Sequence, residues 1–233
     1  GKNPLIVLDD ANLKVAVEAA VNGAYFSAGE RCTASSRIIV TQGIYQKFKE
    51  AILERIKHLK VGDALDPETH VGPVISEAQL NKVLYYIQVG QEEGATLACG
   101  GKRLELEKPG FYIEPTLFTE TSNEMKINRE EIFGPVATLI PVKDYEEALA
   151  IANDTTYGLS AGICTTSLKY AHHFMEHVKA GLTMVNLPTA GVDFHVPFGG
   201  TRGSSYGTRE QGKYAVEFYT IVKTCYSAPY IDD

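Results

Sequence analysis

Two kinds of apolar pattern alternate along the 233-residue chain. Short apolar blocks of about four to eight residues are typical of buried strands, and apolar positions spaced by three and four are typical of one helix face. The blocks predict strands over residues 5–8, 37–40, 95–99, 112–118, 136–142, 159–165, 181–185 and 217–224. The spaced positions predict helices over 13–24, 42–59, 77–91, 145–152 and 168–178, the first of them capped by Asp9 and Asp10.

This order of elements predicts the fold class. Strands separated by helices of about ten or more residues imply crossover connections, so we expect an α/β fold with a largely parallel, open sheet and helices on both faces. A glycine-rich loop over 197–207 then leads to the strand at 217–224, which has no hairpin partner in the sequence. We therefore assign residues 1–216 to one domain and residues 217–233 to a C-terminal strand that pairs with another subunit.

Composition narrows the classes of partner. Acidic residues outnumber basic ones and the net charge is −7, which disfavours a nucleic-acid-binding face. The apolar runs are shorter than the about 18–20 residues that cross a bilayer, so no membrane segment is expected. The four cysteines form no C-x-x-C pair, which predicts no metal site and no disulfide framework and favours a reducing cytoplasm.

The stretch GERCTASSR, residues 29–37, contains the first candidate for chemistry, Cys32. A lone cysteine is often a small buried apolar residue, whereas a nucleophilic thiolate needs a nearby positive charge or a helix N-terminus. Arg31 is adjacent, and the small residues that follow permit a tight turn with N–H groups available to an oxyanion. Cys99, Cys164 and Cys225 lie in or beside predicted strands and are interpreted as structural.

The stretch REEIFGPV, residues 129–136, supplies a second candidate. A carboxylate such as Glu131 can accept hydrogen bonds from the vicinal hydroxyls of a ribose, and an aromatic such as Phe133 can cover a nicotinamide ring; the alternative is an ordinary polar loop. The G-x-S-x-G match at 203–207 does not indicate a hydrolase, because no strand precedes it and the last histidine, His195, lies before it.

Taken together and in order, GERCTASSR, EEIFGPV, VPFGG, REQG and EFYTIVKT resemble the C-terminal half of NAD(P)-dependent aldehyde dehydrogenases along essentially the whole chain. The resemblance implies that Cys32 is the catalytic nucleophile. It also implies that Glu131 and Phe133 contact the ribose and nicotinamide of NAD or NADP, and that Gln79 and Lys82 contact the adenosine side. Phe198 matches an aromatic that lines the aldehyde tunnel, although a core position is an equally good interpretation.

The late runs NLPTAGVDFHVPFGG and GSSYGTREQGKYAVEFYT resemble those of dehydrogenases for 2-oxoglutarate semialdehyde. General or succinate semialdehyde dehydrogenases are the alternative within the family, and a thiol esterase or a non-catalytic domain is the alternative outside it. An anionic substrate requires a cation near Cys32, for which Arg31, Arg202 and His195 are the candidates.

The resemblance also implies what this chain does not carry. In the family, the opening Gly1-Lys2 belongs to an ELGGK motif whose glutamate is the general base, and the cofactor domain and an oxyanion-hole asparagine lie further upstream. The chain opens without methionine and enters a strand almost at once, which suggests a piece of a longer protein. We therefore expect a fragment that is inactive alone and associates as a homodimer or homotetramer.

Overall fold

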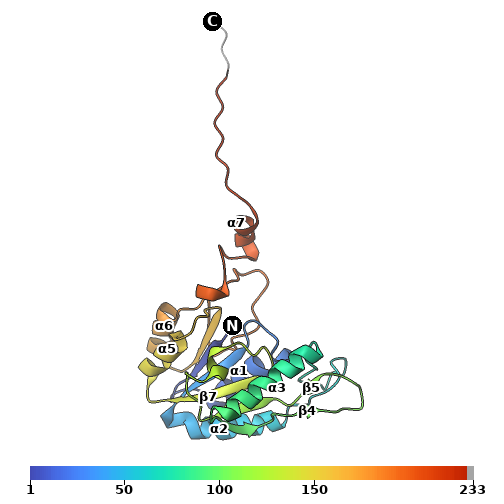
Figure 1. Cartoon of the computed structure of the whole chain (residues 1–233). Helices are drawn as coiled ribbons and strands as arrows, with labels where there is room; N and C mark the ends of the chain where they lie inside the picture. Colours follow the sequence, from blue (N-terminus) through green and yellow to red (C-terminus); the bar gives the residue numbers. More distant parts are fainter. Residues whose placement is uncertain (230–233) are drawn as a thin grey trace.

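The computed structural model describes residues 1–229 and is built on a seven-stranded sheet with helices on both faces (Figure 1). The strand order is β3-β6-β7-β2-β1-β8-β9, and every neighbouring pair is parallel except β3 with β6. The α/β, largely parallel fold is therefore confirmed. The strands of this sheet are β1 (Asn3–Val7), β2 (Ser35–Thr41), β3 (Thr96–Cys99), β6 (Thr116–Thr119), β7 (Val136–Val142), β8 (Ser160–Cys164) and β9 (Leu182–Val185).

The helices divide between two apolar cores, one on each face of the sheet. Helices α1 (Leu13–Tyr25), α2 (Gln42–Lys57) and α3 (Glu77–Glu92) pack in one core, and α5 (Tyr145–Asn153) and α6 (Leu168–His177) pack in the other. Successive side chains of a strand point to opposite faces, so Leu5 of β1 enters the first core and Ile6 the second. The near-continuous apolar strands follow from this double burial.

Two short elements and one divided strand depart from the predicted pattern. The expected strand over 112–118 is divided into β5 (Tyr112–Ile113) and β6 by Glu114 and Pro115, because proline has no N–H to donate to a ladder. β5 pairs instead with β4 (Arg103–Leu104) in a two-stranded sheet. A four-residue helix, α4 (Lys126–Arg129), lies just before the Glu131 loop and is too short to give a periodic apolar signal.

The prediction that Asp9 and Asp10 cap the first helix is wrong. Asn12 is the residue that caps α1, accepting a hydrogen bond from the backbone of Val15 at 3.2 Å. Asp9 accepts instead from the backbone of Ile44 at 3.1 Å, so its carboxylate caps α2, which is more than thirty residues away in sequence. The position of Asp9 just before α1 in the sequence does not reveal that its carboxylate bonds to a different helix, because that contact depends on the tertiary fold.

The predicted strand over 217–224 is not formed in this chain. Residues Ala215–Tyr219 form the short helix α7, and 220–229 have no regular secondary structure and leave the body of the molecule (Figure 1). The side chains of Ile221 and Val222 are 95% and 94% exposed. A strand requires a partner for its backbone groups, and no strand of the described chain pairs with this segment. Residues 230–233 of the predicted tail lie outside the described residues.

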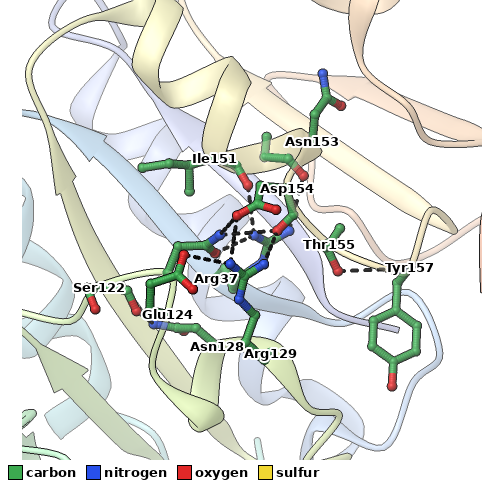
Figure 2. Close-up of polar contacts among 12 residues, drawn as sticks. Arg37, Ser122, Glu124, Asn128, Arg129, Ile151, Asn153, Asp154, Thr155 and Tyr157 are labelled. Atoms are coloured by element: carbon green, nitrogen blue, oxygen red, sulfur yellow. Dashed lines mark hydrogen bonds and ion pairs between the residues drawn. The ribbon is translucent and has the colours of Figure 1, made fainter.

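The amino ends of the parallel strands meet at one edge of the sheet, and this edge gathers the sequence motifs. Arg37 of β2 is fully buried there and donates hydrogen bonds to Lys2 O at 3.0 Å, Asn123 Oδ1 at 2.9 Å, Ile151 O at 2.9 Å and Ala152 O at 3.1 Å. Beside it, Arg129 pairs with Asp154 at 2.7 Å (Figure 2). This network joins the end of α5 to the segments that precede β1 and β7.

Candidate active site

Cys32 lies in the loop between a short 3-10 turn, Phe26–Gly29, and β2, and its side chain is exposed. The preceding Ser27 and Ala28 have φ values of 56° and 55°, a left-handed conformation that costs energy in residues other than glycine. The loop is held by Asn3, whose side-chain amide donates to Cys32 O at 2.9 Å and to Ala34 O at 2.8 Å. The thiol is therefore presented at the surface by a fixed backbone.

The Cys32 loop and the Glu131 loop touch through two glycines. Gly29 has a φ of 67°, and a Cβ atom on it would lie 2.2 Å from Gly134 O. On the other side of the contact, a Cβ on Gly134 would lie 2.4 Å from a methyl carbon of Val83 in α3. Only glycine permits this approach, which explains why each motif contains one at this position.

Arg31, Glu131 and Phe133 line one small cavity at this contact, together with Gly1. Glu131 is half-buried and lies beside Gly1 in this cavity. Phe133 is also half-buried and has a φ of 60°, so the loop that carries it is held in a left-handed turn. The structure thus brings the second predicted motif to the first, about one hundred residues away in sequence.

Gln79 lies on α3 and contacts the loop that carries Glu131 and Phe133. Its side-chain amide donates to Ile132 O at 3.0 Å and to Phe133 O at 2.6 Å, so the amide helps to fix the Glu131 loop. Lys82, one turn further along α3, is exposed. The pKa of Lys2 is lowered to about 7, mainly because Lys2 is buried. The positive charges of Arg37 and Lys82 contribute to lowering it.

Arg31 is anchored to α1. Its guanidinium donates a hydrogen bond to the backbone carbonyl of Asn22, and burial lowers the pKa of this group. The guanidinium lines the same cavity as Glu131, and its hydrogen bond to Asn22 holds it against α1. Although Arg31 is next to Cys32 in the sequence, this alone does not place its positive charge beside the thiol.

The three remaining candidates lie on the loop after β9 and outside the cavity of Glu131. Phe198 is half-buried and exchanges backbone hydrogen bonds with Glu210 at 2.7 and 3.1 Å. His195 is exposed and packs edge-on against Phe194. Arg202 donates to Asn153 O at 2.6 Å and also to Thr155 O, so its guanidinium is used to hold the loop.

Sequence reasoning missed the residues that hold the Cys32 loop. Asn3 is a buried polar side chain at the start of an otherwise apolar strand. A polar residue at such a position indicates a side chain that makes structural hydrogen bonds, and this could have identified Asn3 from the sequence. Thr189, which is fully buried in the loop after β9, gave no signal because threonine is common in loops. Within residues 1–229, no group of three or more histidine, cysteine, aspartate or glutamate side chains is arranged to hold a metal ion. No described helix combines the length and apolarity that membrane crossing requires.

Comparison with known proteins gives a consistent result. The model of the aldehyde dehydrogenase family matches residues 1–225. The chain is 47% identical to the alpha-ketoglutaric semialdehyde dehydrogenase of Bacillus subtilis over 231 residues, covering 98% of this chain and 47% of that protein. The alpha-ketoglutarate semialdehyde dehydrogenase of Haloferax volcanii is 45% identical, with 98% and 48% covered.

Among solved structures, the betaine aldehyde dehydrogenase of Staphylococcus aureus in complex with NAD+ superimposes with a TM-score of 0.90 at 40% identity. The match covers 94% of this chain and 44% of that one. The chain thus spans about half the length of the relatives that it matches.

Proposed function

The chain belongs to the aldehyde dehydrogenase family, and from this premise we propose that the protein containing it oxidises an aldehyde to a carboxylic acid with NAD or NADP, using Cys32 as the nucleophile. One observation carries the proposal: the exposed Cys32 and the Glu131–Phe133 loop meet at the glycine contact between Gly29 and Gly134. Both loops contain left-handed backbone outside glycine, at Ser27, Ala28 and Phe133, and such costly conformations cluster at functional sites.

The proposed reaction begins with addition of the Cys32 thiolate to the aldehyde carbon, which forms a thiohemiacetal. Loss of hydride from that carbon leaves a thioester on Cys32, and water then hydrolyses the thioester to release the acid and the free thiol. When bound, NAD(P) supplies the hydride acceptor. The backbone N–H groups of the Cys32 turn are suited to hold the developing oxyanion, since Asn3 fixes the neighbouring carbonyls inward.

The residues at the cavity fit a cofactor with ribose and nicotinamide groups. Glu131 offers a half-buried carboxylate that accepts hydrogen bonds, and Phe133 offers an aromatic ring beside it. Gln79 would act by holding the Phe133 carbonyl, and Lys82 would offer an exposed positive charge to the adenosine side. Glu131, Phe133 and Lys82 are the proposed cofactor contacts, and Gln79 is proposed to position the loop that carries two of them.

For the substrate we propose 2-oxoglutarate semialdehyde. The similarity to the two semialdehyde dehydrogenases supports it, as do the late motifs of the sequence. Arg31 and His195 are the proposed cations for the anionic end, and Phe198 is proposed to line the aldehyde path. A general or succinate semialdehyde dehydrogenase remains the alternative. A panel of aldehydes that also includes the cationic betaine aldehyde distinguishes a preference for anionic semialdehydes from a preference for a cationic substrate.

The same proposal covers the organisation of the protein. Residues 1–216 form the catalytic domain, and 217–233 pair with a second subunit in a homodimer or homotetramer. The exposed apolar side chains of Ile221 and Val222 support this pairing. The cofactor domain and the general base come from outside this chain, so the chain alone is expected to show slow thiol esterase activity and no NAD-dependent turnover. Its four free cysteines fit the reducing cytoplasm.

The test uses a protein of the relatives' full length that contains this chain. It is mixed with NAD or NADP and a panel of aldehydes, and reduced cofactor is measured by absorbance. Cys32→Ala is expected to abolish turnover, whereas Cys225→Ala, which removes the other exposed thiol, retains it. Dehydrogenase activity in the Cys32→Ala protein would contradict the assignment of the nucleophile.

Glu131→Gln tests the cofactor side separately. Because the substitution removes a positioning contact, we expect hydride transfer to slow more than cofactor binding weakens. The primary deuterium isotope effect on turnover should therefore rise. An unchanged rate together with an unchanged isotope effect would leave Glu131 as a residue of an ordinary loop.

A further inference from the structure

A chain of hydroxyl groups connects the Cys32 loop to the segment that follows β9. Thr189 Oγ1 lies 2.7 Å from Thr33 O, and Ser35 Oγ lies 2.7 Å from Thr189 Oγ1. A carbonyl only accepts, so the single proton of Thr189 is donated to Thr33, and Ser35 must donate to Thr189. The direction of both hydrogen bonds is thus determined by the chemistry of the three groups.

These groups are inaccessible to water. Thr189 is 0% exposed, Ser35 is 1% and Thr33 is 5% exposed. A hydrogen bond that is lost at such a site is not replaced by water. Thr33 O also accepts from Ser160 Oγ, but at the longer distance of 3.4 Å, so Thr189 is the closer of its two donors. Asn3 holds the carbonyls on either side of Thr33, and Thr189 therefore completes a set of three consecutive anchored carbonyls, those of Cys32, Thr33 and Ala34.

Packing fixes the orientation of Thr189. A Cβ on Gly162 of β8 would lie 3.1 Å from the methyl carbon of Thr189, so the methyl group rests on the bare backbone of that strand. A β-branched side chain held by its methyl group has little rotameric freedom, which leaves the hydroxyl directed at Thr33. Valine in its place would keep this packing contact and remove only the hydroxyl.

We propose that Thr189 is a positioning residue for Cys32, because its hydroxyl couples the nucleophile's loop to the segment 186–200 that carries His195 and Phe198. The inference rests on the proposed function, in which that segment forms the substrate side of the site. Movement of segment 186–200 is thereby transmitted to Thr33, the residue that directly follows Cys32.

The kinetic test compares matched variants of the longer protein. Thr189→Val should lower kcat about tenfold, the effect of one ordinary buried hydrogen bond, and leave the KM for the cofactor unchanged. Thr189→Ser restores the hydroxyl and should recover most of the rate. Thr121→Val is the control, since Thr121 is 4% exposed and donates to Leu139 O at 2.8 Å, away from both motifs.

Hydrogen exchange of this chain gives a readout that does not require turnover. Amides in the peptide 31–36 should exchange about tenfold faster in Thr189→Val and at the parent rate in Thr121→Val. If no aldehyde is oxidised by the longer protein, the proposed function fails, and exchange alone decides whether Thr189 fixes the loop. Unchanged exchange at 31–36, an unchanged kcat in Thr189→Val, or an equal loss of kcat in Thr121→Val overturns the inference.

Discussion

Substitution of Gly29 by alanine tests the contact on which the site depends. The new Cβ would lie 2.2 Å from Gly134 O and 2.9 Å from Ala24 O. Carbon and oxygen atoms that are not bonded approach to about 3.3 Å, so the two loops must separate by roughly 1 Å. The φ of 67° is also unfavourable for alanine.

The magnitude follows from these two terms. Forcing an extra carbon into a packed contact costs about 1–3 kcal/mol, and a left-handed alanine costs about 1–2 kcal/mol. Gly29→Ala should therefore lower the free energy of unfolding by about 2–5 kcal/mol. Gly94→Ala is the matched control, because Gly94 has a φ of 88° and a Cβ added to it would meet no atom within 4 Å. That control incurs only the left-handed term.

The assay is urea unfolding of the chain followed by circular dichroism, with the unfolding slope checked for constancy. In the longer protein, a separation of about 1 Å between the nucleophile loop and the Glu131 loop should lower kcat/KM about 100-fold, whereas Gly94→Ala leaves it unchanged. Equal destabilisation by the two substitutions would refute the reasoning, because it would show that the Gly134 contact imposes no steric limit.

Three further predictions follow from buried polar groups. Gln79→Leu leaves the carbonyls of Ile132 and Phe133 without their donor and should raise the KM for the cofactor. Gln88→Leu is the control, because the amide of Gln88 bonds to the exposed Glu92 on the same helix. Lys2→Met should stabilise the protein, because it removes a buried amine whose pKa is lowered from 10.5 to about 7. The gain in unfolding free energy should grow as pH falls from about 10.5 to about 7, because in that range the Lys2 amine is protonated only in the unfolded chain. A gain that does not change with pH in urea titrations contradicts this. Arg37→Met leaves Asn123 Oδ1, Lys2 O and two carbonyls of α5 without their donor at the buried network (Figure 2) and should cost about 3–5 kcal/mol in urea unfolding, whereas Arg103→Met, at an exposed ion pair, should cost less than about 1 kcal/mol.

The sequence by itself determined the order and type of most elements. Apolar blocks such as 136–142 coincide with β7, because a strand buried on both faces is apolar at most of its positions. The sequence also placed Cys32 and Glu131 in separate loops before strands. Since parallel strands begin at the same edge of a sheet, the two motifs were bound to lie near one another once the fold was known.

The tertiary structure decided how each loop is held. Thr189 and Thr33 are 156 positions apart, and Gln79 and Phe133 are 54 apart, so no local pattern records either hydrogen bond. Asp9 caps α2 rather than α1 for the same reason. The segment at 217–224 has β-forming composition but no strand beside it in this chain, and an unpaired backbone does not form a strand. Periodicity reports which side of an element is buried, whereas hydrogen-bond partners depend on which elements the fold brings together.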